Sequence, residues 1–307
     1  MTRIGIIGTG DVAHNHIIGL LTSNNYEISG CYSPENSRAM VFARQYRLIS
    51  YSTPEALFKD VDTVDITDDF PETMHLAELS LKAMKHVFIA RPDRLNMNQM
   101  RYLRNMAEES GTVLQFGTGY KYCPVYHLLE KSMQTAQLVD VRHQLVNSGD
   151  WYAQLINELS YDFDFVMSVL NTSIQKLDVK TCTASENAAD VLHFRLECDN
   201  GCTVNMTTYT VAEGDPQLEM TFTSSDAVVR ADIFKSLIER RSRTCNTVDS
   251  ITLDSYNERT THKHYLKNFY LAICNEFDAL RNIDKQFQNR DAADYLIESI
   301  KLMVRYK

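Results

Sequence analysis

The chain has 307 residues, of which 44% are hydrophobic and 23% are charged, a balance typical of folded globular proteins. The formal net charge is −9 and no basic block is present, so we expect no nucleic-acid partner. No apolar run approaches the ~20 residues that a membrane-spanning helix needs, so we expect no membrane partner. The length is sufficient for two domains of ordinary size.

Strands and helices are predicted to alternate through residues 1–118. The strands are rich in Val and Ile, and they cover Ile4–Gly8, Tyr26–Tyr32, Thr63–Thr67, His86–Ala90 and Thr112–Gly117. The helices between them cover Val12–Leu21, Ser37–Tyr46, Pro71–Met84 and Asn98–Ser110. This alternation predicts a doubly wound parallel sheet with helices on both faces. Ligands of such sheets bind beyond the carboxyl ends of the strands.

The first strand runs into a glycine-rich turn with the pattern G-x-G-x-x-A, which occupies residues 8–13. Gly8 lets the chain turn tightly, and Gly10 lets backbone N–H groups approach a pyrophosphate at the N-terminus of the next helix. The turn predicts a Rossmann domain that binds a dinucleotide through Gly8, Thr9, Gly10, Asp11 and Val12. A Rossmann domain that keeps the turn without a ligand is the alternative.

The pattern changes after Gly119, where we predict a helix over Pro124–Gln134, a strand over Leu138–Val146 and a helix over Ile156–Leu170. The single tryptophan, Trp151, is placed on the loop before that helix. Successive strands then cover 175–183, 189–198, 202–211, 217–223 and 227–233, and two helices close the chain at His264–Leu280 and Ala292–Tyr306. We therefore expect a Rossmann domain over 1–118 and, over 119–307, an α+β domain with a mostly antiparallel open sheet.

The seven cysteines are scattered and form no C-x-x-C. Cys198 and Cys202 flank Asn200-Gly201 and are predicted to face each other in a hairpin, without His or Cys partners at zinc spacing. We therefore expect no metal site and reduced thiols. Because the sequence begins directly with a strand, we also expect no signal peptide and a cytoplasmic location.

Several segments occur in the order typical of one family. They are the glycine turn, residues 62–75, residues 84–88, Lys121-Tyr122-Cys123-Pro124 and residues 158–165. In these segments the chain resembles the glucose–fructose oxidoreductase, inositol dehydrogenase and rhizopine-catabolism (Gfo/Idh/MocA) family of NAD(P)-dependent oxidoreductases. The resemblance implies the two domains above, a small sugar or polyol substrate, and a homodimer or homotetramer formed through the C-terminal sheet. It also implies that Thr67 and His75 contact the cofactor, although a capping or core role for His75 is an alternative.

The chain departs from the family at residues 90–92, where Ala-Arg-Pro replaces Glu-Lys-Pro. A guanidinium is effectively always charged, so Arg91 cannot act as a general base. Arg91 can still polarise a carbonyl oxygen or, with Pro92, contact the cofactor.

A second departure is Tyr161, which stands where the family usually has histidine. A phenol has a pKa near ~10, and a nearby cation such as Arg91 or Lys121 can lower it enough for acid–base catalysis. Asp164 lies three residues further on the same helix face, where it would bond a substrate hydroxyl. The alternative for Tyr161 is a half-buried packing role.

The ribose end of the predicted cofactor site lacks the acidic residue of NAD-preferring domains at its usual position, which is Ser33. Ser33, Ser37 and Arg38 favour NADP, unless Arg38 is simply solvated. Two acidic side chains, Asp68 and Asp69, follow the third strand. Because carboxylates repel a pyrophosphate, we expect them to point away from the turn or the loop to differ from the family's.

Together these observations predict an NAD(P)-dependent oxidoreductase that transfers a hydride between nicotinamide and a hydroxyl-bearing or carbonyl carbon. Tyr161 would move the proton, Arg91 and Lys121 would hold the oxygen, and Asp164 would orient the substrate. The alternative is a dinucleotide-binding regulator or pseudoenzyme of the same fold.

Overall fold

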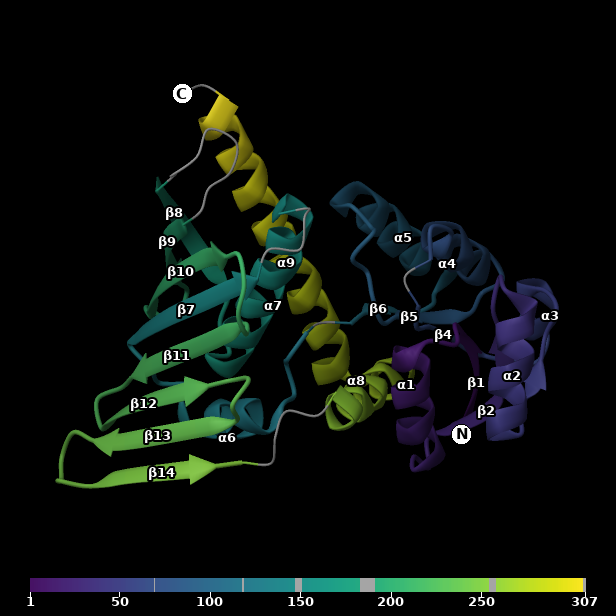
Figure 1. Cartoon of the computed structure of the whole chain (residues 1–307), viewed down its shortest axis with the longest axis horizontal. Helices are drawn as coiled ribbons and strands as arrows, with labels where there is room; N and C mark the ends of the chain where they lie inside the picture. The colour runs from purple at the N-terminus through teal and green to yellow at the C-terminus, as the bar shows by residue number, and fades with distance from the viewer. Residues whose placement is uncertain (69, 118, 147–150, 183–190, 254–257, 306–307) are drawn as a thin grey trace. The chain divides into compact units, whose positions relative to one another are not determined.

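The computed structural model describes residues 1–68, 70–117, 119–146, 151–182, 191–253 and 258–305. The chain forms two compact units (Figure 1). Unit 1 contains Met1–Gly119 and Glu258–Phe287, and unit 2 contains Tyr120–Asn257 and Gln288–Lys307. The sequence-based boundary at 118/119 therefore needs one correction, because residues 258–287 belong with the first unit.

Unit 1 is built on a six-stranded parallel sheet in the order β3-β2-β1-β4-β5-β6. This is the strand order of a Rossmann fold, and the predicted doubly wound sheet is confirmed. The strands are β1 (Thr2–Ile7), β2 (Tyr26–Tyr32), β3 (Ile49–Ser50), β4 (Thr63–Ile66), β5 (His86–Ile89) and β6 (Leu114–Phe116).

Helices cover both faces of this sheet. Alternate residues of its strands point to opposite sides, and apolar residues on each side pack against the helices there. Their bounds are α1 (Asp11–Leu21), α2 (Asn36–Tyr46), α3 (Pro54–Phe58), α4 (Thr73–Lys82) and α5 (Met97–Ser110). One core joins Ile4 and Ile6 of β1 to α1 and α2. The other core joins Ile7 and the apolar residues of β4 and β5 to α3, α4 and α5.

A helix from late in the chain, α8 (Glu258–Ile273), packs on the first of these cores. Its Tyr265 and Phe269 rings lie against Phe88 of β5. The Tyr26 hydroxyl donates to the backbone carbonyl of Leu266 at 2.8 Å. This burial of aromatic surface explains why the segment joins unit 1 rather than the domain that precedes it in the sequence.

Unit 2 contains an eight-stranded sheet in the order β14-β13-β12-β11-β7-β10-β9-β8. Neighbouring strands are antiparallel except β7 and β10, which confirms the predicted mostly antiparallel open sheet. The strands are β7 (Leu138–Val146), β8 (Ile174–Cys182), β9 (Val191–Cys198), β10 (Thr203–Val211), β11 (Gln217–Thr223), β12 (Ala227–Asp232), β13 (Leu237–Ser242) and β14 (Val248–Thr252).

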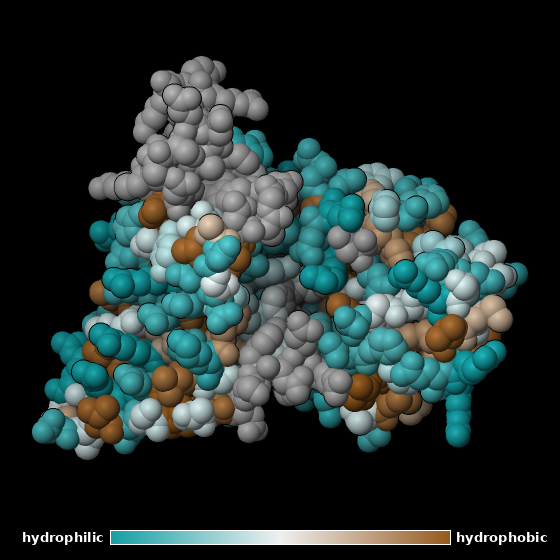
Figure 2. All heavy atoms as spheres, in the orientation of Figure 1, coloured by the Kyte–Doolittle hydropathy of each residue, from teal (hydrophilic) through white to brown (hydrophobic). Residues whose placement is uncertain are grey.

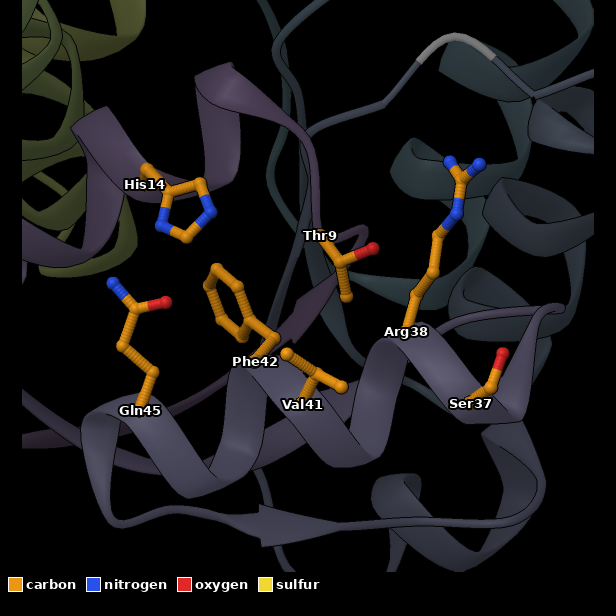
Figure 3. A pocket seen from close by; sticks show the side chains of 7 residues that line it. All are labelled: Thr9, His14, Ser37, Arg38, Val41, Phe42 and Gln45. Carbon is orange, nitrogen blue, oxygen red and sulfur yellow. The ribbon is translucent and has the colours of Figure 1, made fainter.

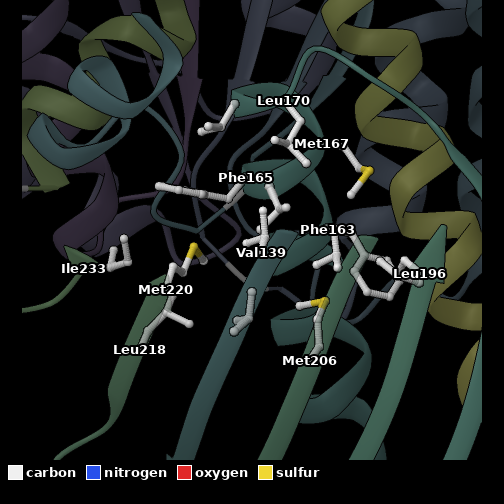
Figure 4. Close-up of a cluster of buried hydrophobic side chains, with 14 of the residues drawn as sticks. Val139, Phe163, Phe165, Met167, Leu170, Leu196, Met206, Leu218, Met220 and Ile233 are labelled. Carbon is white, nitrogen blue, oxygen red and sulfur yellow. The ribbon is translucent and has the colours of Figure 1, made fainter. Parts of the chain in front are cut away.

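The inner face of this sheet packs against α6 (Pro124–Ser132), α7 (Trp151–Val169) and the second half of α9 (Phe277–Arg305). Figure 4 shows Val139, Met206 and Met220 of the strands facing Phe163 and Phe165 of α7. The other face is polar, and its exposed residues include Asp140 and Arg142. On the surface visible in Figure 2, hydrophilic and hydrophobic side chains are interspersed.

Some predicted elements were wrong or incomplete. Trp151 begins α7 rather than lying on a loop, because the buried repeat that marks the helix, Leu155, Leu159 and Phe163, begins only one turn later. The last two helices break at Asn275, which has a φ of 62°, and α9 then continues unbroken through the mostly polar residues 281–291. Four further elements, β3, α3, β13 and β14, were not predicted from the sequence. Among the residues that the structure describes, no helix is both long enough and apolar enough to cross a membrane.

Candidate active site

The glycine turn has the geometry that its sequence predicts. Gly8 follows β1 with a φ of 132°, a conformation that favours glycine, and its N–H donates to the carbonyl of Tyr32 at 3.0 Å. Gly10 is the N-cap residue of α1, and because glycine has no side chain it cannot itself provide a side-chain cap for the helix. Asp11 and Val12 form the first turn of α1, so the turn presents backbone N–H groups at a helix N-terminus.

The side chain of Asp68 occupies this turn, and the expectation that it points away is wrong. One carboxylate oxygen accepts from the Thr9 N–H at 2.8 Å and from the Gly10 N–H at 3.0 Å, and the other lies 3.1 Å from the Gly10 nitrogen. The Thr67 hydroxyl donates to the same carboxylate at 3.4 Å. The helix dipole, together with N–H groups that have no partner within the helix, explains why the Asp68 carboxylate binds here. Asp69 lies outside the described residues.

A cavity of about 250 Å³ opens beside the turn, between α1 and α2 (Figure 3). Its lining is Thr9, His14, Ser37, Arg38, Val41, Phe42 and Gln45. The ring centroids of His14 and Phe42 lie 4.9 Å apart. The Thr9 hydroxyl points toward the Arg38 side chain (Figure 3). Ligand pockets commonly measure about 300–1,000 Å³, so this cavity matches part of a dinucleotide better than a whole one.

The ribose end contains an acidic residue that the sequence analysis missed. Glu35 precedes α2, and its carboxylate lies 2.7 Å from Nε of Arg38 and accepts from the Ser37 hydroxyl at 3.3 Å. Ser33 is buried at the end of β2, and its hydroxyl accepts from the Glu35 N–H at 3.3 Å. The missed signal was an acid two residues beyond the position usually inspected.

The remaining predicted cofactor residues have different surroundings. Arg91 follows β5 with 57% of its side chain exposed, and its guanidinium lies 3.5 Å from the Asp93 carboxylate. Pro92 is buried beside it. Thr67 is buried, and its hydroxyl proton is shared between the Asp68 carboxylate and the Ile7 carbonyl, whose oxygen lies 3.2 Å away. His75 is exposed on the first turn of α4.

In unit 2, Lys121 and Asp164 form a buried ion pair with a separation of 3.1 Å. Their side chains are only 3% and 0% exposed, and the amide of Asn289 donates to the same carboxylate at 3.4 Å. Burial alone would lower the pKa of Lys121, but the charge of Asp164 outweighs it and the pKa is raised. Tyr161, on the same helix as Asp164, is half-buried against the unit 2 core.

A polar network next to Tyr161 was not foreseen from the sequence. Asp162 accepts a hydrogen bond from the Tyr120 hydroxyl and lies 2.8 Å from Nδ1 of His143, and the Tyr120 ring meets the Tyr161 ring edge-on. Burial would lower the pKa of His143, but the charges of Asp162 and Glu158 and the bond to Asp162 raise it. The network joins the segment before α6, strand β7 and helix α7, and its partners lie 19 and 42 residues from Asp162 in the sequence, which explains why no local pattern revealed it.

Cys198 and Cys202 face each other as predicted, with the Cys198 N–H donating to the carbonyl of Cys202 at 2.9 Å. Both are free thiols. Burial raises the pKa of Cys198 to about 12, with a smaller contribution from the neighbouring Cys202. Within the residues that the structure describes, no group of three or more His, Cys, Asp or Glu side chains is arranged to hold a metal ion.

Comparison with known proteins finds a family resemblance in the first unit. A model described as "Oxidoreductase family, NAD-binding Rossmann fold" (Gfo/Idh/MocA) matches residues 2–118. Over these residues the chain is similar to the Gfo/Idh/MocA family. The match spans the glycine turn, β4 and the Arg91 segment, and it confirms the resemblance seen in the sequence.

Individual relatives are distant. The UDP-N-acetylglucosamine 3-dehydrogenase of Acidithiobacillus ferrooxidans is 21% identical over 258 residues, which cover 81% of this chain and 80% of that protein. The glucose-6-phosphate 3-dehydrogenase of Bacillus subtilis is 24% identical over 144 residues, 46% of this chain and 40% of that protein. A Gfo/Idh/MocA family oxidoreductase from Vibrio cholerae has the same fold, with a TM-score of 0.82, 15% identity and coverage of 99% of this chain and 100% of that one.

Proposed function

We propose that this protein is an NAD(P)-dependent oxidoreductase that acts on a CH–OH group or the corresponding carbonyl of a sugar, polyol or related small molecule. The observation that carries the proposal is the glycine turn of unit 1, whose Thr9 and Gly10 N–H groups already bind an anion. The match of residues 2–118 to an oxidoreductase family model supports the reaction class, and the names of two relatives, both 3-dehydrogenases of hexose derivatives, support a sugar-type substrate.

The residues of unit 1 fit a dinucleotide. The N–H groups of the glycine turn would hold the pyrophosphate in place of the Asp68 carboxylate, and the Thr9–Arg38 cavity would take the adenosine end. Arg91 and Pro92 would lie on the nicotinamide side, together with Thr67 and His75. A bound nicotinamide would supply or accept the hydride.

The residues at the proposed ribose site favour different cofactors. Ser37 and Arg38 support binding of the 2′-phosphate of NADP, whereas the Glu35 carboxylate repels a phosphate and accepts from free ribose hydroxyls. We propose that both dinucleotides bind and that Glu35 reduces the preference for NADP that Arg38 creates.

Tyr161 is the proposed proton donor and acceptor for the substrate oxygen, and Arg91 is the proposed cation that polarises that oxygen. Lys121 and Asp164 were expected to touch substrate. Because they are buried and paired with each other, we instead propose that they position the α7 helix that carries Tyr161. This pairing supports Tyr161, rather than Lys121 or Asp164, as the proton-transfer residue.

The proposal is tested by calorimetric titration with NADH and NADPH, followed by a turnover screen. UDP-N-acetylglucosamine, glucose 6-phosphate and myo-inositol are the first substrates to try, each with both oxidised cofactors. Dinucleotide binding with turnover supports the oxidoreductase. Dinucleotide binding without turnover of any sugar or polyol would favour the alternative, a dinucleotide-binding regulator. Absence of dinucleotide binding would refute both the oxidoreductase and the regulator.

We also propose a homodimer or homotetramer that forms through the outer face of the unit 2 sheet, in a reducing cytoplasmic compartment. The exposed Asp140 and Arg142 on that face can pair with the same residues of a second copy. Six cysteines whose side chains the structure describes are free thiols, which is compatible with reducing conditions; they are Cys31, Cys123, Cys198, Cys202, Cys245 and Cys274. Light scattering coupled to gel filtration measures the assembly, and a monomer at micromolar concentration would contradict it.

A further inference from the structure

The N–H groups that would hold a pyrophosphate are already satisfied by an internal anion. The carboxylate of Asp68 receives hydrogen bonds of 2.8 Å from Thr9 and of 3.0 Å and 3.1 Å from Gly10. Both amides belong to the turn before α1, and Asp68 immediately follows Thr67 at the carboxyl end of the β4 region. The carboxylate therefore stands where a phosphate oxygen would stand.

The absence of side chains at Gly8 and Gly10 leaves the space that the Asp68 carboxylate occupies. A Cβ atom on Gly8 would lie 2.8 Å from the carboxylate carbon of Asp68, and one on Gly10 would lie 3.0 Å from its Oδ1. The hydroxyl of Thr67 adds a further hydrogen bond to the same oxygen. The carboxylate is thus held by three groups of the protein rather than resting on the surface.

A carboxylate and a diphosphate cannot share this place. Both are anions that use the same N–H donors, and like charges at hydrogen-bonding distance repel strongly. A dinucleotide can bind the turn only after the Asp68 side chain has left it.

We propose that Asp68 sets the affinity of this protein for dinucleotides by occupying the pyrophosphate subsite when no cofactor is bound. The inference rests on the proposed function, since it assumes that the turn accepts a dinucleotide at all. It adds an affinity-determining residue that acts on the pyrophosphate, the part that NAD and NADP share. The apparent Kd equals the intrinsic Kd divided by the fraction of molecules whose turn is open, so closing the turn weakens binding in proportion.

Three consequences follow for a variant that lacks the carboxylate. In Asp68→Ala the Kd for NADH and for NADPH falls by the same factor, about tenfold if the turn is open in about a tenth of molecules. The Kd for ADP-ribose falls equally, because it contains the same diphosphate. The Kd for adenosine, which contains none, is unchanged.

The experiment is calorimetric titration of the full-length protein, of Asp68→Ala and of Asp68→Asn with these four ligands. Asp68→Asn keeps an acceptor oxygen for the turn, so it provides a neutral variant should the alanine variant not fold. Asp62→Asn is the matched control, because it also removes one negative charge beside β4, but from a carboxylate that pairs with exposed Arg3. Thermal unfolding verifies that each variant is folded.

Tighter binding of the three diphosphate ligands by both Asp68 variants, with the control unchanged, supports the inference. Equal or weaker binding by the Asp68 variants, while the unaltered protein binds dinucleotides, overturns it and leaves the proposed function intact. If neither the unaltered protein nor any variant binds a dinucleotide, the proposed function fails and the inference fails with it. Binding that appears only in the Asp68 variants supports both.

Discussion

The ammonium of Lys121 lies 3.1 Å from the carboxylate of Asp164, and both side chains are buried in unit 2. Removing one member of a buried ion pair leaves an uncompensated charge, at a cost of about 3–5 kcal/mol. We therefore expect Lys121→Met to reduce the free energy of unfolding by about that amount, measured by urea denaturation. The double variant with Asp164→Leu should recover most of the loss, whereas additive losses would show that the two residues do not act as a pair.

Tyr161 is the residue whose hydroxyl the proposed chemistry requires. Tyr161→Phe should lower kcat by about 10²–10⁴-fold, the usual contribution of a positioned acid–base group, while the Kd for NADH stays unchanged. Tyr295→Phe is the control, since Tyr295 is 71% exposed on α9. A Tyr161→Phe variant with normal kcat would assign the residue to packing against Tyr120.

Glu35 and Arg38 form an exposed pair at the proposed ribose site. Glu35→Gln removes the charge that opposes a 2′-phosphate and frees Arg38 to bind it. We expect the ratio of NADPH affinity to NADH affinity to rise about tenfold, which corresponds to ~1.4 kcal/mol. Arg38→Ala should move the same ratio in the opposite direction. Identical ratios in all three proteins would place the ribose elsewhere.

His143 makes the stability of unit 2 dependent on pH. Its pKa is raised in the folded protein, chiefly by Asp162 against the opposing effect of burial, so the folded state binds the proton more tightly than the unfolded state does. The stabilisation is complete below the unfolded pKa of about 6.5 and is lost as the pH rises through the folded pKa. The stability difference between the unaltered protein and His143→Gln should therefore shrink as the pH increases from 6, as measured by denaturation at successive pH values. A difference that grows would contradict this sign.

Gly8 combines a φ of 132° with close neighbours, because an added Cβ would lie 2.2 Å from the Thr67 hydroxyl oxygen. Gly8→Ala should therefore destabilise the protein by more than the ~1–3 kcal/mol of backbone strain alone, and it should abolish dinucleotide binding. Gly111→Ala is the control: Gly111 has a φ of 64°, but its Cβ would meet nothing within 4 Å. Equal losses of stability in the two variants would show that crowding at Gly8 contributes nothing.

Features that depend on local order along the chain were predictable. The turn at Gly8 and Gly10, the strand–helix alternation around it and the later run of strands follow from residue types at fixed spacings. Element ends and weakly patterned elements were not predictable in this way. The mostly polar stretch 281–291 offers only Ile283 and Phe287 as apolar residues, yet it lies within α9 because the residues on either side are held by packing.

Neighbouring residues encode the Rossmann fold, the second sheet and the glycine turn, so these features follow from the sequence. The folded chain was needed to show that Asp68 binds Thr9 and Gly10, that Lys121 and Asp164 neutralise each other, and that α8 joins unit 1. These contacts join residues dozens or more positions apart. Their partners are selected by burial and by unsatisfied hydrogen-bonding groups, which exist only once the chain is folded.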